Sequence, residues 1–357
     1  MSISVVIPSY NAGPQVSRLL QDLAACAVDP GDSIEVVVAD DGSTDGTDDL
    51  LAGLSLPYQL TYLYLPRTEA SGRATARNAA IGKASGDVIV MLDADQTVEP
   101  GFLAAHAAYH RLRPDLVVAG PRGDLVDGEL AGWDGRELVM AEFSENLNNL
   151  ATRWHYAFSC NLSVRRTHLQ AVGGFDEGFR GWGLEDSELG YRLHRLGLAF
   201  AFNPAAVTYQ TRRHITPAMF DEWRANLDHF VAKHHGTADV AIQQIICRAL
   251  DPADWSLDWL QCMVRMEFAA RGLAGRLPEP AAYTLLEAAD ADADAALARL
   301  PELAAAHDLV VIDDTGDGRL GGPAQTLTTA KELAYFHRPS AQARQRILER
   351  YRATTSG

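Results

Sequence analysis

The sequence lacks several features that mark whole classes of protein. Its cysteines form neither a CxxC pair nor a Cys/His pair at zinc spacing, so we expect reduced thiols and no structural zinc. No apolar run approaches the roughly 18 residues of a membrane-spanning helix, and no charged leader or cleavable apolar segment precedes the first strand-like run. These absences predict a cytoplasmic protein without a transmembrane segment. The cysteines are Cys26, Cys160, Cys247 and Cys262.

Basic charge is also scarce. The chain has 31 Lys and Arg residues against 47 Asp and Glu residues, which gives a formal net charge of −16. This balance argues against a general nucleic-acid or anionic-membrane surface, although a local basic pocket for a phosphate stays compatible with it. Two phosphate-binding fingerprints are missing as well. No GxGxxG follows the first strand-like run, which argues against NAD binding, and no GxxxxGK[ST] loop occurs anywhere.

The first half of the chain alternates short apolar runs with helical patterns. Runs rich in β-branched residues are typical of buried parallel strands, and the intervening patterns have helical periodicity. Alternation at this spacing predicts an α/β fold built on a doubly wound parallel sheet. The predicted strands are 3–7, 34–39, 60–65 and 87–92, with helices at 14–27 and 72–84. Further strands are expected at 116–119, 158–166 and 199–202, with a helix at 136–152.

A second region is expected to follow the sheet. The pattern becomes helical from about residue 216, which predicts a catalytic domain at 1–235 and a mostly helical C-terminal region at 236–357. Trp255 and Trp259 share one face of a predicted helix, which favours core packing or a subunit contact, so a homo-oligomer formed through the C-terminal helices is possible. The predicted helices are 240–250, 255–271 and 281–305, with an edge strand at 309–314.

Polar clusters follow three of the predicted strands. Tyr10 and Asn11 follow the first strand, Asp40 and Asp41 the second, and the segment 93–95 (DAD) the fourth. In doubly wound sheets, ligands bind beyond the carboxyl ends of the strands. Two carboxylates separated by one residue suit a hard cation such as Mg²⁺ or Mn²⁺. Each cluster also has a purely structural interpretation, as a turn with a helix cap or as a loop with solvated carboxylates.

Two arginines lie one turn apart on the helix predicted at 72–84. Arg73 and Arg77 could support a diphosphate with charge-assisted hydrogen bonds. This would be the local basic pocket that the acidic net charge leaves open.

The segment 181–188 (GWGLEDSE) combines a flat aromatic side chain with an acidic pair. Trp182 beside Gly183 offers an apolar face on which a sugar ring can stack. Glu185 and Asp186 would lie in the first turn of a helix, where the positive helix terminus favours ionised carboxylates. A charged carboxylate beside a sugar platform can act as a general base for a hydroxyl nucleophile. The alternative is an acidic helix cap next to a core tryptophan.

Six such segments, in this order, resemble one family. The first 220 or so residues are similar to the inverting family 2 glycosyltransferases with the GT-A (Rossmann-like) fold. The Gly-Trp-Gly-x-Glu-Asp form is also similar to galactosyl- and N-acetylgalactosaminyl-transferases of related families. The segments are 6–11 (VIPSYN), 38–45 (VADDGSTD), 76–78 (ARN), 92–95 (LDAD), 173–177 (GGFDE) and 181–186 (GWGLED).

The resemblance implies a binding site for a nucleotide sugar, most often a UDP-sugar in this family. Pro8, Tyr10 and Asn11 would line the nucleotide pocket. Asp40 would contact the base, with Asp41 close by.

The resemblance also implies a divalent metal, Mn²⁺ or Mg²⁺. Asp95 would bind the metal, and Asp93, next to Ala94 in the nucleotide site, would face the ribose or the metal. His214 matches a later histidine that completes the metal site in several such enzymes.

The catalytic roles fall to the acidic pair. Asp186 would be the base, Glu185 would bond donor or acceptor hydroxyls, and Trp182 with Gly183 would form the sugar platform. The acceptor stays unknown. Two alternatives remain: a nucleotidyltransferase, which should have a Gly-rich, Lys/Arg-bearing loop after the first strand, and a non-catalytic sugar-binding module, which would not need the Asp93 and Asp95 pair.

Overall fold

The computed structural model describes most of the chain. It covers residues 1–134, 150–211, 216–237, 284–306, 309–326 and 333–338, with positions 147, 263, 267, 270, 344, 345, 348, 354 and 355. The helix predicted at 240–250, most of the helices predicted at 136–152 and 255–271, His214 and the Trp255/Trp259 pair lie outside these residues. Within the described part of the chain, neither Cys26 nor Cys160 forms a disulfide bond. No helix in that part has the length and apolar character needed to cross a membrane.

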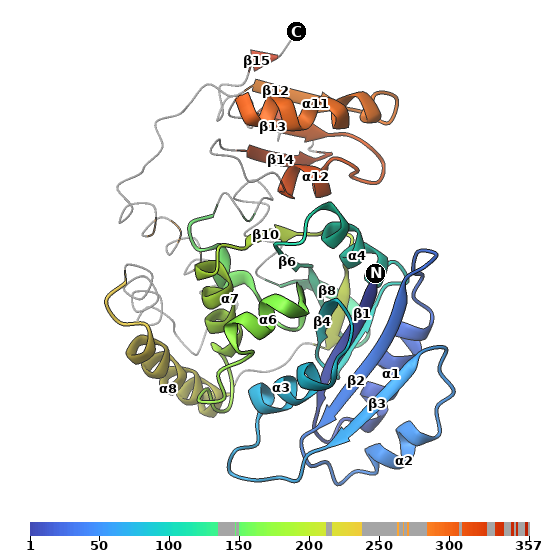
Figure 1. The fold of residues 1–357 in the computed structure, drawn as a ribbon, viewed down its shortest axis with the longest axis vertical. Coiled ribbons are helices and arrows are strands. Elements are labelled where there is room, and N and C mark those ends of the chain that lie inside the picture. Colours follow the sequence, from blue (N-terminus) through green and yellow to red (C-terminus); the bar gives the residue numbers. More distant parts are fainter. Residues whose placement is uncertain are drawn as a thin grey trace.

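A seven-stranded sheet organises the first 211 residues, with strand order β10-β6-β9-β4-β1-β2-β3. The strands near the N-terminus pair in parallel, as the sequence pattern predicts (Figure 1). β9 departs from the all-parallel prediction because it runs antiparallel to both β4 and β6. The strands are β1 (Ser2–Ser9), β2 (Ser33–Asp40), β3 (Gln59–Tyr64), β4 (Val88–Leu92), β6 (Leu116–Ala119), β9 (Asn161–Arg165) and β10 (Ala199–Phe202).

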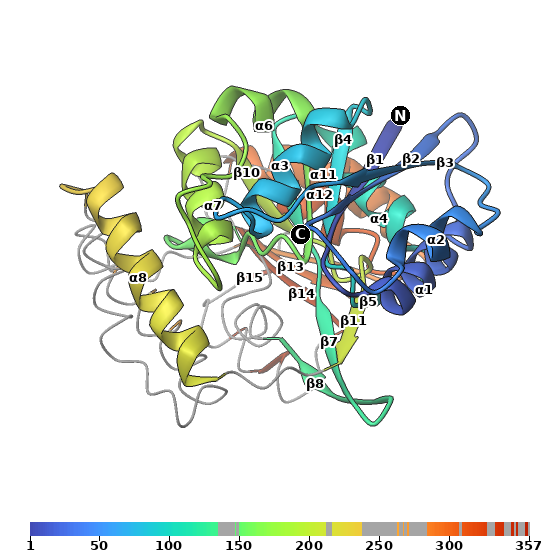
Figure 2. The ribbon, with the colours of Figure 1, turned by 90° about the horizontal axis from the view of Figure 1, so that it is seen from below.

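Helices cover both faces of this sheet (Figure 2). On β2, Val36 and Val38 pack with α1 on one face, whereas Val37 and Ala39 pack with α3 on the other. Both faces of the strand are buried, which explains why its sequence is continuously apolar instead of alternating. The elements are α1 (Gly13–Ala24), α2 (Thr47–Ala52), α3 (Arg73–Lys83), α4 (Phe102–Leu112), η2 (Arg153–Tyr156), α6 (Arg166–Val172), α7 (Glu185–Arg195) and α8 (Pro217–Lys233).

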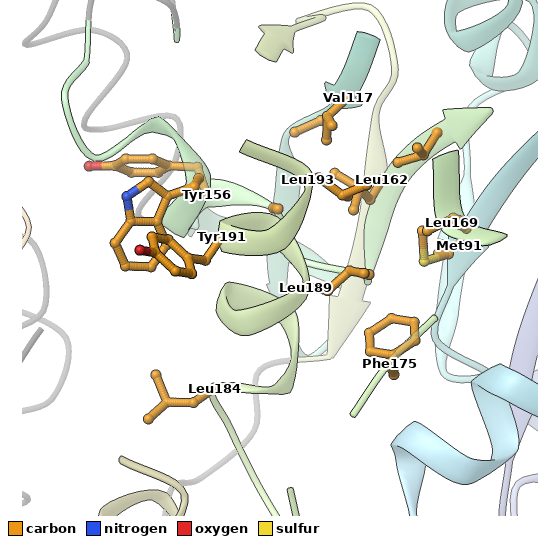
Figure 3. Packing of buried hydrophobic residues seen from close by; sticks show 14 of the residues in the cluster. Met91, Val117, Tyr156, Leu162, Leu169, Phe175, Leu184, Leu189, Tyr191 and Leu193 are labelled. Atoms are coloured by element: carbon orange, nitrogen blue, oxygen red, sulfur yellow. The ribbon is translucent and has the colours of Figure 1, made fainter. Parts of the chain in front are cut away.

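The larger core cluster surrounds α7. Leu189 and Leu193 point from this helix toward the sheet, where they meet Leu162 of β9, while Tyr191 packs on the opposite side (Figure 3). α7 begins at Glu185, which is the helix start that the sequence predicts. The core therefore fixes the position of the acidic pair that opens α7.

A second, four-stranded sheet extends from the carboxyl end of the first, in the order β5-β11-β7-β8. The chain passes from β6 of the first sheet to β7 of the second through Gly120, where an added Cβ would lie 2.2 Å from the carbonyl oxygen of Ala206. Only glycine allows this close approach of two backbone segments. The strands are β5 (Gln96–Val98), β7 (Arg122–Val126), β8 (Glu129–Trp133) and β11 (Thr208–Thr211).

The C-terminal region contains a parallel sheet of its own, in the order β14-β13-β12-β15, which the prediction of a mostly helical region misses. The helix expected at 281–305 is wrong in its first part, because β12 precedes α11. The edge strand predicted at 309–314 is present as β13, but it lies inside the sheet, between β12 and β14. α12 packs on α4 and on β10 of the seven-stranded sheet. The elements are β12 (Thr284–Ala288), α11 (Ala293–Ala306), β13 (Leu309–Asp313), α12 (Gly321–Thr326), β14 (Leu333–His337) and β15 (Thr354–Thr355).

Candidate active site

A cavity of about 540 Å³ opens at the carboxyl ends of β1, β2 and β4. This is the edge at which doubly wound sheets bind their ligands. Seven residues predicted for the site line it: Pro8, Tyr10, Asp41, Arg73, Asp93, Ala94 and Asp95. The other lining residues are Ser9, Ala12, Gln15, Arg67, Ser71, Gly72, Ala76, Gly181 and Glu222.

One end of the cavity has an aromatic ring, a guanidinium and a carboxylate in contact. The guanidinium carbon of Arg67 lies 4.1 Å from the centre of the Tyr10 ring. Arg67 Nη1 also donates to Asp41 Oδ2 at 2.8 Å. Asp41 Oδ1 is buried and has no hydrogen-bond partner among the described residues. Burial raises the pKa of Asp41 against the opposing effects of Ser71 and Arg67.

Arg67 was not predicted from the sequence. It follows β3 at the same edge of the sheet as the polar clusters after β1, β2 and β4, and this position is the signal that could have identified it.

Asp40, which is predicted to contact the base, is hydrogen-bonded within the protein. Its side chain is fully buried, and its two oxygens accept hydrogen bonds from the Ser43 N–H at 2.7 Å and the Tyr62 hydroxyl at 2.5 Å. Asn11 is likewise occupied, because its Oδ1 accepts from the Thr44 N–H at 2.9 Å and its own N–H donates to Ser43 Oγ at 2.8 Å. Both residues shape the loop after β2, and neither lines the cavity.

The carboxylates of the DAD segment lie in the cavity wall. Gln210 on β11 donates from Nε2 to both oxygens of Asp95, at 2.9 and 2.8 Å. Asp93 pairs with Arg77, whose Nη2 lies 2.9 Å from Asp93 Oδ1. These oxygen donors fit a hard divalent cation. The described residues hold no group of three or more His, Cys, Asp or Glu side chains placed to bind a metal, and His214 lies outside them.

Arg77, which is predicted to support the diphosphate, is buried and does not line the cavity. Its side chain is 2% exposed, and Nη1 lies 3.1 Å from Glu185 Oε1 and 3.5 Å from Asp186 Oδ1. Burial by itself lowers the pKa of Arg77, but the carboxylates of Asp186, Asp93 and Glu185 outweigh it and raise that pKa. Arg77 therefore joins the DAD segment to the start of α7. Arg73, one turn earlier, does line the cavity.

Asp186 is held between this arginine and a buried hydroxyl. Ser159 Oγ donates to Asp186 Oδ1 at 2.6 Å. Burial, followed by the charge of Glu185, raises the pKa of Asp186 to about 7, although Arg77 and Ser159 act in the opposite direction. Asp186 lies in the first turn of α7, after the N-cap residue Leu184.

The loop before α7 is fixed from both sides. Arg73 Nη1 donates to the Gly181 carbonyl at 3.1 Å, and the Trp182 N–H donates to Glu222 Oε2 of α8 at 2.8 Å. The Trp182 side chain is partly buried and packs against the larger core cluster. At Gly183, φ is +96°, a conformation that L side chains rarely adopt. Gly181 lines the cavity, whereas Trp182 and Gly183 follow it in the loop.

Comparison with known proteins now assigns the domain. Residues 4–173 match glycosyl transferase family 2, and residues 142–215 match the N-terminal domain of galactosyltransferase. The chain contains a family 2 glycosyltransferase domain. This match favours a glycosyltransferase over the nucleotidyltransferase and the non-catalytic sugar-binding module.

Curated relatives share part of their length with the chain. It is 26% identical over 282 residues to the uncharacterized glycosyltransferase YfnE of Bacillus subtilis (strain 168), covering 66% of this chain and 71% of that protein. It is 32% identical over 261 residues to validoxylamine A glucosyltransferase of Streptomyces hygroscopicus subsp. limoneus, covering 65% of this chain and 56% of that protein. The chain therefore spans little more than half the length of the second relative.

Solved structures share the fold. The crystal structure of S. aureus TarS 1-349 in complex with UDP has a TM-score of 0.51 at 19% identity, covering 85% of this chain and 80% of that one. The fold is the mixed α/β GT-A glycosyltransferase fold.

Proposed function

We propose that the protein is a metal-dependent, inverting glycosyltransferase that moves a sugar from a nucleotide sugar to an acceptor hydroxyl. The observation that most directly supports this is the connection made by Arg77. It pairs with Asp93 in the cavity wall and with Asp186 at the start of α7, so a binding cavity and a candidate base belong to one network.

The nucleotide would bind where Tyr10, Arg67 and Asp41 meet. Asp41 lines the cavity beside Arg67, and its carboxylate would accept a hydrogen bond from a nucleobase N–H or a ribose hydroxyl. Tyr10, with its side chain half-exposed and Arg67 stacked on it, offers a flat face for the base. TarS, with the same fold, binds UDP in its crystal structure, and we propose a UDP-sugar as the donor here.

The diphosphate would lie toward Arg73 and the DAD segment. Asp95, with Asp93 beside it, would hold Mn²⁺ or Mg²⁺, and His214 remains a further predicted ligand. When bound, such a metal offsets the negative charge that grows on the departing diphosphate. Arg73 lines the same cavity and adds a positive charge to the site.

Asp186 would act as the general base. The acceptor hydroxyl attacks the anomeric carbon while its proton passes to Asp186, and the bond from that carbon to the nucleoside diphosphate breaks. Attack from the face opposite the leaving group inverts the anomeric configuration. A pKa of about 7 is well matched to this role, because a base with that pKa is substantially ionised at neutral pH and still accepts a proton readily.

The test is a transfer assay. The protein is incubated with Mn²⁺, a panel of UDP-, GDP- and dTDP-sugars and candidate hydroxyl acceptors, and nucleoside diphosphate release is measured. We expect release from one donor class, strongest for UDP, and a product whose anomeric configuration, read by NMR, is opposite to that of the donor. Retained configuration would contradict the inverting mechanism. Asp186→Asn serves as the inactive reference. If the wild-type protein releases no more nucleoside diphosphate than this variant from any donor, the proposed activity is contradicted.

A further inference from the structure

α8 reaches the cavity although it begins after residue 215, the last residue that either family match covers. Its contribution is Glu222, an exposed carboxylate that lines the cavity. Glu222 Oε2 accepts the hydrogen bond from the Trp182 N–H. Oε1 receives no hydrogen bond from any described residue. One oxygen is therefore anchored to the loop before α7, and the other is free to meet a ligand.

The position of this carboxylate is tightly defined. A Cβ on Gly181 would lie 2.4 Å from the Glu222 carboxyl carbon, and Gly181 has a φ of +65°. The carboxylate therefore packs directly on the loop backbone, in space that any other residue at position 181 would fill.

α8 itself is held at a fixed register. Asn226, one turn after Glu222, accepts from the Arg180 N–H at 3.0 Å and donates to the carbonyls of Arg180 and Gly183, each at 2.8 Å. Near the other end of the helix, Lys233 Nζ lies 2.8 Å from Glu188 Oε1 on α7. Asn226 is buried and satisfied by the loop, so its role is structural. Glu222 differs because it is exposed and has an unused acceptor.

We propose that Glu222 is a sugar-binding residue whose Oε1 accepts hydrogen bonds from hydroxyl groups of a pyranose ring in the cavity. This rests on the proposed function. Carboxylates are suited to this task because hydrogen bonds from hydroxyls to an ionised acceptor are short and about twice as strong as neutral ones. The ring belongs either to the donor sugar or to the acceptor, and the chemistry of recognition is the same for both.

The test compares Glu222→Gln with Asp221→Asn. Glutamine keeps a carbonyl oxygen to accept from the Trp182 N–H, so the loop should stay in place, but it loses the charged acceptor. Asp221 is the neighbouring acidic residue, with a 78% exposed side chain, so Asp221→Asn removes the same charge from α8 outside the cavity. Thermal unfolding of both variants should match that of the wild-type protein.

We expect Glu222→Gln to raise one Michaelis constant by about 10-fold, the loss typical of a hydrogen bond to a charged group, while the affinity for free UDP stays unchanged. Asp221→Asn should alter neither. Hydrolysis of the donor in the absence of acceptor distinguishes the two rings. If Glu222→Gln raises the Michaelis constant for the donor in this reaction, Glu222 binds the donor sugar. A rise seen only for the acceptor assigns it to the acceptor.

Three outcomes would overturn the assignment or its basis. If the wild-type enzyme is active and the Michaelis constants of Glu222→Gln equal those of the wild type, Glu222 does not bind the sugar, and the proposed function is unaffected. An equal loss of free UDP affinity would mean that Glu222 only braces the loop. A wild-type protein that turns over no nucleotide sugar would remove both this role and the proposed function.

Discussion

The Arg77 guanidinium lies 3.5 Å from the Asp186 carboxylate. The pairing lowers the pKa of Asp186, yet burial and the charge of Glu185 outweigh it and leave that pKa raised, at about 7. An ordinary surface carboxylate titrates some three pH units lower. This difference makes the ionisation of Asp186 measurable within the pH range in which the protein can be assayed.

The first prediction concerns pH. Because the base must be ionised, kcat/KM should rise about tenfold per pH unit up to about pH 7 and then level off. Asp186→Asn should lower the rate by at least ~10²-fold and remove this acidic limb. Ser159→Ala removes a hydrogen bond that favours the ionised carboxylate, so the limb should move to higher pH. A profile identical in Ser159→Ala and wild type would argue against Asp186 as the titrating group.

The second prediction separates the two arginines of α3. Arg77→Met leaves Asp93, Glu185 and Asp186 without their shared cation, so the free energy of unfolding should fall by about 3–5 kcal/mol. Arg73→Met should change it by no more than about 0.5 kcal/mol but should weaken UDP binding. Denaturant unfolding and calorimetry measure the two effects. Equal stability of the two variants would contradict the structural role of Arg77.

The central parallel strands β1, β2 and β4 were predictable because each forms a largely apolar run whose residues are buried on both faces. β12 was not, since Thr284–Ala288 adjoins an Ala- and Asp-rich stretch with a helical pattern. It becomes a strand because β13 and β15 pair with it on either side. Pairing partners distant in the chain override local preference here.

The site was predictable at the level of segments but not of individual side chains. A strand-end Asp-Asp pair indicates a binding edge, yet only the structure separates Asp40, bonded within the protein, from Asp41 in the cavity wall. The one-turn spacing of Arg73 and Arg77 likewise does not reveal which side chain is buried. Glu222 reaches the cavity through the packing of α8, and no local motif signals it.

The third prediction follows from the Asp40 and Asp41 pair. Asp41→Asn should weaken UDP binding, since it removes the charge from the carboxylate that faces the cavity and pairs with Arg67. Asp40→Asn should lower stability by about 1–3 kcal/mol, because its fully buried oxygens accept from Ser43 and Tyr62. Calorimetry with UDP and denaturant unfolding distinguish the two. A larger loss of UDP affinity in Asp40→Asn would return the base contact to Asp40.

The last prediction concerns the metal and the amide that orients its proposed ligand. If Asp95 binds Mn²⁺, Asp95→Ala should abolish the metal dependence of UDP binding measured by calorimetry. Gln210 holds both Asp95 oxygens, and partners of this kind are worth about 10–100-fold in metal affinity. Gln210→Ala should therefore raise the Mn²⁺ concentration needed for half-maximal UDP binding by that factor, because the carboxylate loses its fixed orientation.

Thr211→Ala, at the next and exposed position of β11, is the matched control and should behave like the wild-type protein. With EDTA present, Gln210→Ala and wild type should bind UDP equally, since the amide acts only through Asp95. A loss of UDP affinity in EDTA would mean that Gln210 supports the cavity itself. If UDP binding by Asp95→Ala still depends on Mn²⁺, Asp95 is not the metal ligand. Asp93 would then be the next carboxylate to test, because it lines the same cavity.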